Sequence, residues 1–126
     1  MNSTDLKRIT DQIAIDQARK ELLWRQPFVT EESLERALEY AQAFVAANPR
    51  KIEKWRDRAS YKPIVFYAEH YIYDYGVIEC PDPKEELAKI MRQAKGAGWM
   101  PHFVMIQAAM LRKLLKESHG DCAPHQ

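Results

Sequence analysis

Helix-boundary signals recur along the 126-residue chain so closely that they leave little room for strands. Thr30 stands directly before "EESLERALEYAQAFVAA", and Asp82 followed by Pro83 opens "PKEELAKIMRQAK". Side chains such as threonine and aspartate accept hydrogen bonds from the first-turn amides of a helix, and proline is tolerated there because its missing amide would have no partner. The glycines of "GAG" at 96–98 are typical of a helix end. The sequence therefore predicts helices that begin just after Thr30 and Asp82.

Apolar residues repeat at helical spacing between these boundaries. Leu34, Leu38, Ala41 and Val45 form a stripe that one face of a helix would bury. Comparable boundaries frame residues 5–26, 49–60 and 101–119. We therefore predict an all-α fold, a single compact bundle of about five helices. One helical domain would cover residues 1–120, and residues 121–126 would form a flexible C-terminal tail.

The segment "YKPIVFYAEHYIYDYG", residues 61–76, suits two structures. As a helix it would take its cap from Ser60, carry Pro63 in its first turn and place Tyr67, Tyr71 and Tyr75 on one face. As a hairpin it would use the preference of aromatic and β-branched residues for strands. We expect the helix because the neighbouring segments are helical. The alternative is an α+β fold with one small hairpin around residues 64–79.

Composition limits the classes of partner that the whole chain can attract. The formal net charge is +1, so the chain as a whole is not committed electrostatically to nucleic acid or to an anionic membrane. The start "MNSTDLKRITDQ" is polar and no run of eighteen apolar residues occurs, so we expect a soluble protein without membrane association. Cys80 and Cys122 form no CxxC pair, which fits the reducing cytoplasm.

Tyrosine is concentrated in the ambiguous segment, which holds five of the six tyrosines in the chain. Tyrosine offers a large apolar body and a polar tip with few rotatable bonds, and it is enriched at protein interfaces. We therefore expect a non-enzymatic regulator or adaptor that docks on a protein by occlusion or bridging. Its contact residues would be Trp55, Tyr67, Tyr71, Tyr73 and Tyr75. A self-complementary tyrosine patch would also be compatible with a homodimer.

A second hypothesis is nucleic-acid binding by the window "RKIEKWRDRASYK", residues 50–62. It holds six basic and two acidic residues with two interleaved aromatic residues, a combination that can contact phosphates and stack on bases. The basic residues are Arg50, Lys51, Lys54, Arg56, Arg58 and Lys62. The same pattern also describes an ordinary solvated helix face.

Enzyme signatures are missing from the sequence. It contains no GxxxxGK[ST], GxGxxG, GxSxG or HExxH motif, so we expect neither catalysis nor a cofactor. His70 and Asp74 are four apart and would share a helix face, but such a pair is more often a structural hydrogen bond than a catalytic or metal site. The C-terminal run carries His119, Asp121, Cys122 and His125, which are metal-ligand types, yet this run lies at and beyond the end of the last predicted helix, and no metal site is expected.

Overall fold

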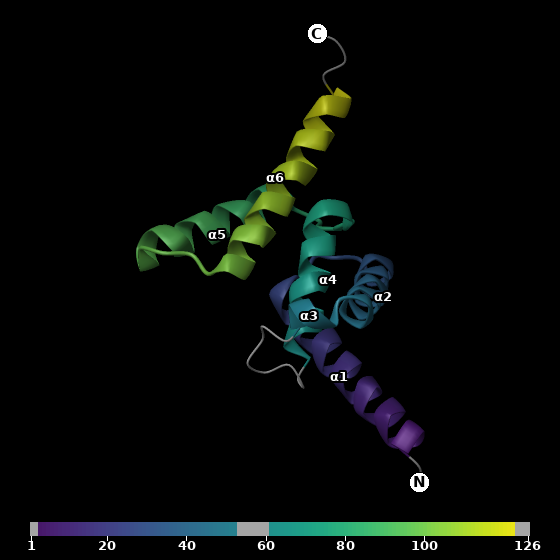
Figure 1. Ribbon diagram of the computed structural model, residues 1–126. Helices are drawn as coiled ribbons and strands as arrows, with labels where there is room; N and C mark the ends of the chain where they lie inside the picture. Colours follow the sequence, from purple (N-terminus) through teal and green to yellow (C-terminus); the bar gives the residue numbers. More distant parts are fainter. Residues whose placement is uncertain (1–2, 53–60, 123–126) are drawn as a thin grey trace. The chain divides into compact units, whose positions relative to one another are not determined.

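The computed structural model describes residues 3–52 and 61–122, with side chains described for residues 12–51 and 61–117. Every element of regular secondary structure assigned in this part of the chain is a helix, and Figure 1 shows the helices in order. They are α1 (Ser3–Arg25), α2 (Glu31–Ala47), α3 (Pro49–Ile52), α4 (Lys62–Tyr75), α5 (Pro83–Ala97) and α6 (His102–Cys122). The predicted all-α class is confirmed. The alternative hairpin around residues 64–79 is wrong, because α4 occupies most of that segment.

The chain divides into two compact units. Met1–Val77 forms an N-terminal unit that contains α1 to α4, and Ile78–Gln126 forms a C-terminal unit that contains α5 and α6. A single domain over residues 1–120 stays a prediction, as does the tail at 121–126, of which 123–126 lie outside the described residues. The backbone of α6 continues through Gly120 to Cys122, because glycine can also adopt helical dihedral angles at a modest entropic cost.

Helix α2 has the boundaries that its sequence predicts and most of the predicted buried face, of which Val45 is only half-buried. The hydroxyl of Thr30 accepts a hydrogen bond from the amide of Ser33 at 3.2 Å. Leu34, Leu38 and Ala41 are buried, each with 1% of its surface exposed or less. The Thr30 cap fixes where the helix begins, and the burial of its apolar stripe stabilises it, so the local sequence and the tertiary packing favour the same helix.

Helix α4 forms in spite of its aromatic and β-branched composition. Pro63 lies in its first turn, and the amide of Gly76 donates to the carbonyl of Ile72 at 2.8 Å. The residue at the cap position is Tyr61, which makes no side-chain capping hydrogen bond, and Ser60 lies outside the described residues. Val65, Ala68 and Ile72 are buried on one face, so tertiary burial outweighs the weak intrinsic helix propensity of the segment.

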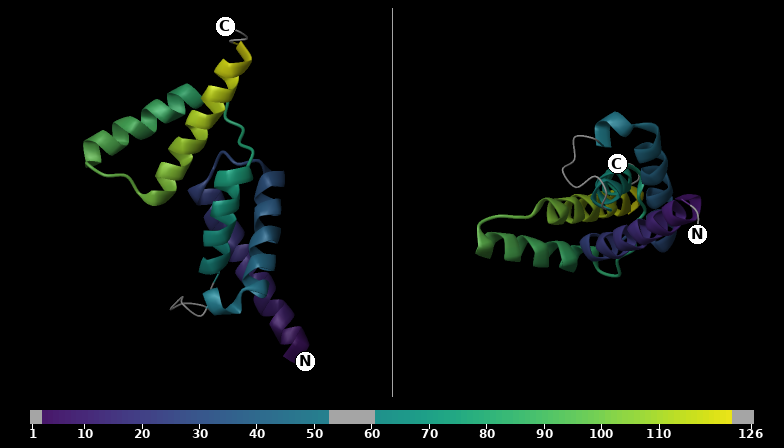
Figure 2. Two further views of the ribbon diagram at one scale, coloured as in Figure 1. Left: turned by 45° about the horizontal axis from the view of Figure 1, so that its top comes forward. Right: turned by 60° about the horizontal axis from the view of Figure 1, so that its bottom comes forward.

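The helices of the N-terminal unit pack around one core. Helix α4 packs mainly against α2 and also against α1 (Figure 2). The pairing of α2 with α4 is antiparallel, because the amide of Thr30 at the start of α2 donates to the carbonyl of Val77 just beyond the end of α4 at 2.9 Å. Leu22 from α1, Leu38 from α2 and Ile72 from α4 are fully buried in this unit.

The C-terminal unit is a helical hairpin in which α5 packs against α6. Asp82 caps α5 by accepting from the amide of Glu85 at 3.1 Å, as the sequence predicts. Gly98 follows the helix with φ of 79°, the left-handed conformation that a helix end needs and that glycine adopts without strain. Across the described residues, no helix combines the length and the apolar character needed to cross a lipid bilayer.

Candidate functional site

Five aromatic rings form a continuous row over the junction of α2 and α4, which we call the aromatic row. Its members in order are Tyr75, Tyr71, Tyr40, Phe44 and Tyr67. The successive ring centroids lie 5.3, 5.2, 5.9 and 4.3 Å apart, and every pair is tilted. The first three separations lie within the range of attractive aromatic pairs, and Phe44 and Tyr67 are slightly closer still. Each ring therefore supports the position of the next.

The row continues around α4 through two further rings. Phe66 meets Tyr67 edge-on, with centroids 5.0 Å apart and ring planes at 88°. The His70 ring lies 4.6 Å from the ring of Phe66. The aromatic surface of α4 is thus broader than its contact with α2.

Helical spacing on both elements produces this arrangement. Tyr67, Tyr71 and Tyr75 recur every four residues along α4, and Tyr40 and Phe44 are four apart on α2. The antiparallel pairing of the two helices sets Tyr40 beside Tyr71 and Phe44 beside Tyr67. Sequence reasoning missed Tyr40 and Phe44, although their spacing beside the buried stripe of α2 was a readable signal.

The aromatic row lies at the edge of the core and is partly open to solvent. Tyr75 is 71% exposed and Tyr40 is 42% exposed, while Phe44, Tyr67 and Tyr71 are half-buried. The sequence alone could not show whether the tyrosine cluster was core or surface. Its rings belong to both, because each half-buried ring packs on its neighbours and leaves an edge or face uncovered.

Two of the predicted contact residues do not join the aromatic row. Tyr73 is 51% exposed and makes no ring contact with any residue that the structure describes. It lies two positions from both Tyr71 and Tyr75, and two residues correspond to about 200° around a helix. Trp55 lies outside the described residues. The structure therefore brings together Tyr67, Tyr71 and Tyr75.

A buried ion pair fixes α4 against the end of α1. The carboxylate of Glu69, with its side chain only 5% exposed, accepts from Arg25 Nη2 at 2.7 Å and from Arg25 Nε at 3.1 Å. It also accepts from the amide of Gln26 at 2.8 Å. The hydrogen bond to Glu69 raises the pKa of Arg25, against the opposing effect of burial. This paired contact holds α4, and with it the tyrosines, in a defined orientation.

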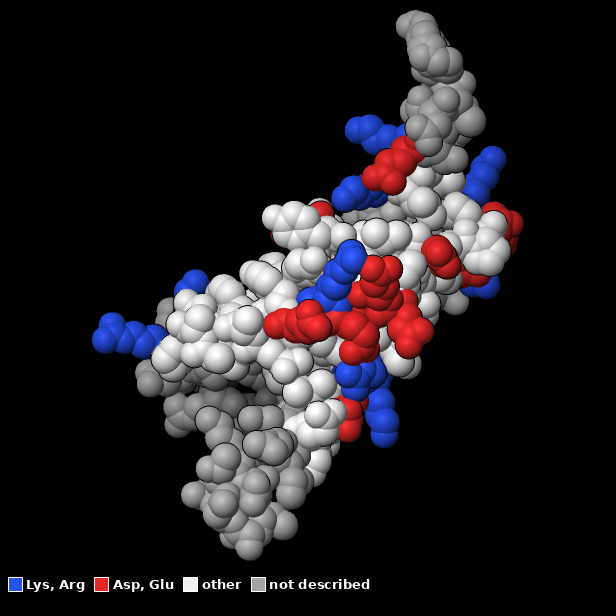
Figure 3. All heavy atoms as spheres, turned by 90° about the vertical axis from the view of Figure 1, so that its right-hand side faces the viewer, with Lys and Arg blue, Asp and Glu red and all other residues white. Residues whose placement is uncertain are grey.

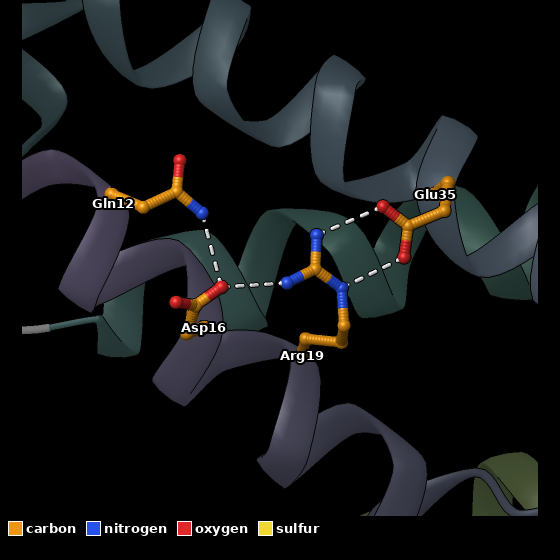
Figure 4. Close-up of polar contacts among 4 residues, drawn as sticks. All are labelled: Gln12, Asp16, Arg19 and Glu35. Atoms are coloured by element: carbon orange, nitrogen blue, oxygen red, sulfur yellow. Dashed lines mark hydrogen bonds and ion pairs between the residues drawn. The ribbon is translucent and has the colours of Figure 1, made fainter.

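A second ion pair joins α1 to α2, and Figure 4 shows how the planar guanidinium of Arg19 meets both carboxylates. Arg19 donates to the two oxygens of Glu35 at 2.8 and 2.9 Å and to Asp16 at 2.8 Å. Gln12 donates to Asp16 at 3.0 Å. The hydrogen bond with Glu35 raises the pKa of Arg19, and the same bond lowers the pKa of Glu35. Bidentate geometry of this kind fixes orientation as well as distance.

The predicted basic window is only partly described. Arg50, Lys51 and Lys62 are exposed, and the amine of Lys51 lies 5.2 Å from the centroid of the Phe44 ring. Lys54, Arg56 and Arg58 lie outside the described residues. On the face drawn in Figure 3, acidic and basic side chains lie side by side among the described atoms and uncharged surface adjoins them.

The predicted pairing of His70 with Asp74 does not form. Both side chains are exposed, and within the described ranges no hydrogen bond or ion pair joins them, since His70 instead packs on the ring of Phe66. No group of three or more His, Cys, Asp or Glu side chains among the described residues could hold a metal ion. The side chains of the tail residues, from His119 to His125, lie outside the described part.

Comparison of the sequence with protein-family models, with curated proteins and with solved structures finds no match. The fold places the protein in the all-α class. Since no related protein informs its function, the function must be argued from the surface of the chain itself.

Proposed function

We propose that this protein is a non-enzymatic adaptor or regulator that docks on a protein partner through the aromatic row of α2 and α4. The observation that carries the proposal is the row itself, five rings in unbroken contact with an exposed end at Tyr75. Aromatic side chains dominate the binding energy of protein interfaces, because they bury much area and lose few rotamers. A partner segment with apolar side chains would pack on the rings and accept hydrogen bonds from the phenol groups.

Docking on the row would act by occlusion or bridging and would require no chemical step. The half-buried rings Tyr67, Tyr71 and Phe44 are already ordered by their neighbours. Ordering before binding lowers the entropic cost of forming a complex. We further propose that the protein acts in the cytoplasm, where a free thiol such as that of Cys80 stays reduced.

Site-specific photo-crosslinking tests the proposal directly. The photoreactive amino acid p-benzoylphenylalanine replaces Tyr75 in one variant and Tyr73 in a matched control. Both positions are exposed tyrosines of α4, but only Tyr75 belongs to the row. Each variant is irradiated in lysate of the native host, with and without nuclease treatment, and crosslinked proteins are identified by mass spectrometry. We expect one defined protein crosslinked in stoichiometric yield from position 75 and little or none from position 73.

Equal labelling from both positions would show that the row has no special role, and no labelling from position 75 would refute the proposal. Crosslinks that disappear when nuclease is added would transfer the binding role to nucleic acid. A circular dichroism spectrum of each variant controls for folding.

Nucleic-acid binding remains a second candidate, favoured by the exposed cations Arg50, Lys51 and Lys62 at one end of the α2–α4 pair. Each phosphate that a cation neutralises adds about 0.9 to the slope of log affinity against log salt on duplex DNA. Fluorescence anisotropy with a labelled duplex would therefore give a steep salt dependence if this candidate is correct. An unchanged affinity after charge reversal at Arg50 and Lys62 would exclude these two residues as contacts.

A further inference from the structure

Charge is distributed unevenly along the α2–α4 pair that carries the aromatic row. The first half of α2, residues 31–39, holds four glutamates and one arginine, and the end of α4 adds the exposed Asp74. The single arginine, Arg36, pairs with Glu32, and Glu35 pairs with Arg19. Glu31, Glu39 and Asp74 are exposed carboxylates at this end. The Tyr75 end of the row therefore lies at an acidic end of the helix pair.

The opposite end of the pair is basic. From Tyr40 onward α2 and α3 contain no acidic residue, and they end with the exposed cations Arg50 and Lys51. Lys62 opens α4 at the same end, since the two helices run antiparallel. The amine of Lys51 lies against the ring of Phe44, which fixes a cation directly beside the row. The row thus runs from an acidic to a basic end.

A two-fold axis through the middle of such a row would bring each end onto the opposite end of a second copy. Tyr71 lies midway along α4 between Tyr67 and Tyr75, which are about 12 Å apart at the rise of an α-helix. With the axis near Tyr71, the part of the row around Tyr67 and Lys51 in one copy lies opposite the part around Tyr75 and Asp74 in the other copy. Two-fold interfaces need this self-complementarity, in which each contact occurs twice.

We propose that the aromatic row is an isologous dimer interface, in which a second copy of this chain packs antiparallel on the first. The rings around Tyr71 form its apolar centre, and Lys51 of each copy faces Asp74 of the other at its two edges. This inference rests on the proposed function, because it names the protein partner that the same row binds. Charges at the edge of an interface select orientation and partner more than they add affinity.

Sedimentation equilibrium of the full chain between about 5 and 500 µM tests the dimer. Three variants probe the edge pair: Lys51→Glu, Asp74→Lys and the double variant that carries both changes. Lys51 and Asp74 are exposed, so the fold should tolerate the changes, and circular dichroism checks this. Lys20→Glu, an exposed change of equal charge on α1, is the matched control.

The wild-type chain should dimerise within this range, and each single reversal should weaken association by about tenfold, because one attractive pair becomes a repulsive pair at two places. The double variant should regain association to within about threefold of wild type, since reversing both partners restores attraction. The control should dimerise as wild type does. A chain that is monomeric at every concentration overturns the proposal. So does a dimer whose association constant is unchanged by the single charge reversals, or is lower in the double variant than in either single variant.

Crosslinking from position 75 separates the failure of this inference from that of the proposed function. A monomeric chain that captures a different protein from position 75 leaves the docking function standing and overturns the dimer. A monomeric chain that captures nothing overturns both. A product of twice the chain mass, formed by purified protein from position 75 and not from position 73, supports the dimer.

Discussion

Removing the carboxylate of Glu69 should destabilise the N-terminal unit strongly. Glu69→Ala would remove the bidentate carboxylate partner of the Arg25 guanidinium, which is only 22% exposed, and it would remove one acceptor of the buried Gln26 amide. Breaking a buried ion pair by removing one partner costs about 3–5 kcal/mol, because the other charge stays desolvated. Arg25 retains part of its hydration, so we expect about 3 kcal/mol, the lower end of this range.

The double variant Arg25→Met with Glu69→Leu removes both charges and keeps most of the volume. Replacing a whole buried ion pair by apolar residues is often neutral, so this variant should lie within about 1.5 kcal/mol of wild type. Urea denaturation followed by far-UV circular dichroism is carried out on the double variant and on its two matching single variants, Arg25→Met and Glu69→Leu, which completes a double-mutant cycle. The coupling free energy between the two positions should be at least about 2 kcal/mol.

The reasoning would be refuted if the free energy of unfolding of Glu69→Ala lay within about 1 kcal/mol of the wild-type value, because that loss is typical of exposed ion pairs. It would equally be refuted if the two single changes were additive in the double variant. Either result would mean that Arg25 and Glu69 do not act as a buried pair in solution.

Three further predictions concern the core, the glycines and one ion pair. Leu38→Ala should cost about 2–5 kcal/mol in urea denaturation, because the side chain is 1% exposed, and a loss below about 1 kcal/mol would contradict the packing of α2. Gly76→Ala should destabilise by about 1–3 kcal/mol, since its added Cβ would lie 2.6 Å from a backbone oxygen one turn back. Gly96 lies inside α5, and a Cβ added there would have no atom within 4 Å, so Gly96→Ala should stabilise the helix and raise the melting temperature. If both glycine substitutions stabilised the protein, or both destabilised it, this contrast would be refuted. The pKa of Glu35 is lowered by its hydrogen bond from Arg19, so the advantage of wild type over Glu35→Gln should be complete above the ordinary glutamate pKa. It should vanish as pH falls through the depressed pKa of the folded state, and an advantage that grew in acid would contradict the pairing.

Local sequence signals were sufficient to place most of the helices. Thr30, Asp82 and Gly98 act at the helix ends where the sequence predicts them, because a cap depends on residues within one turn. The segment 61–76 was ambiguous for the opposite reason. Its propensities favour a strand, and the burial of Val65 and Ile72 decides for a helix.

The candidate site could be predicted only where it lies within one helix. The spacing of Tyr67, Tyr71 and Tyr75 was visible, since all three share a face of α4. The contribution of Tyr40 and Phe44 depends on how α2 aligns with α4, and that alignment is set by packing between segments about thirty residues apart in sequence. The partner of Glu69, 44 residues away at Arg25, was hidden for the same reason.

Two rings of the aromatic row leave much of their surface in solvent, since Tyr75 is 71% exposed and Tyr40 is 42% exposed, and a partner could cover this surface. Leu34, Leu38 and Ile72 are fully buried, and the two ion pairs join α1 to α2 and to α4. If burial in the monomer were the only use of the row, smaller apolar residues at Tyr40 and Tyr75 would leave less exposed aromatic surface at little cost to the core. The rings instead contact one another on a firmly held pair of helices. A binding surface on such a platform loses little entropy on binding, so a partner that covers the row gives up less of its binding free energy to the ordering of side chains.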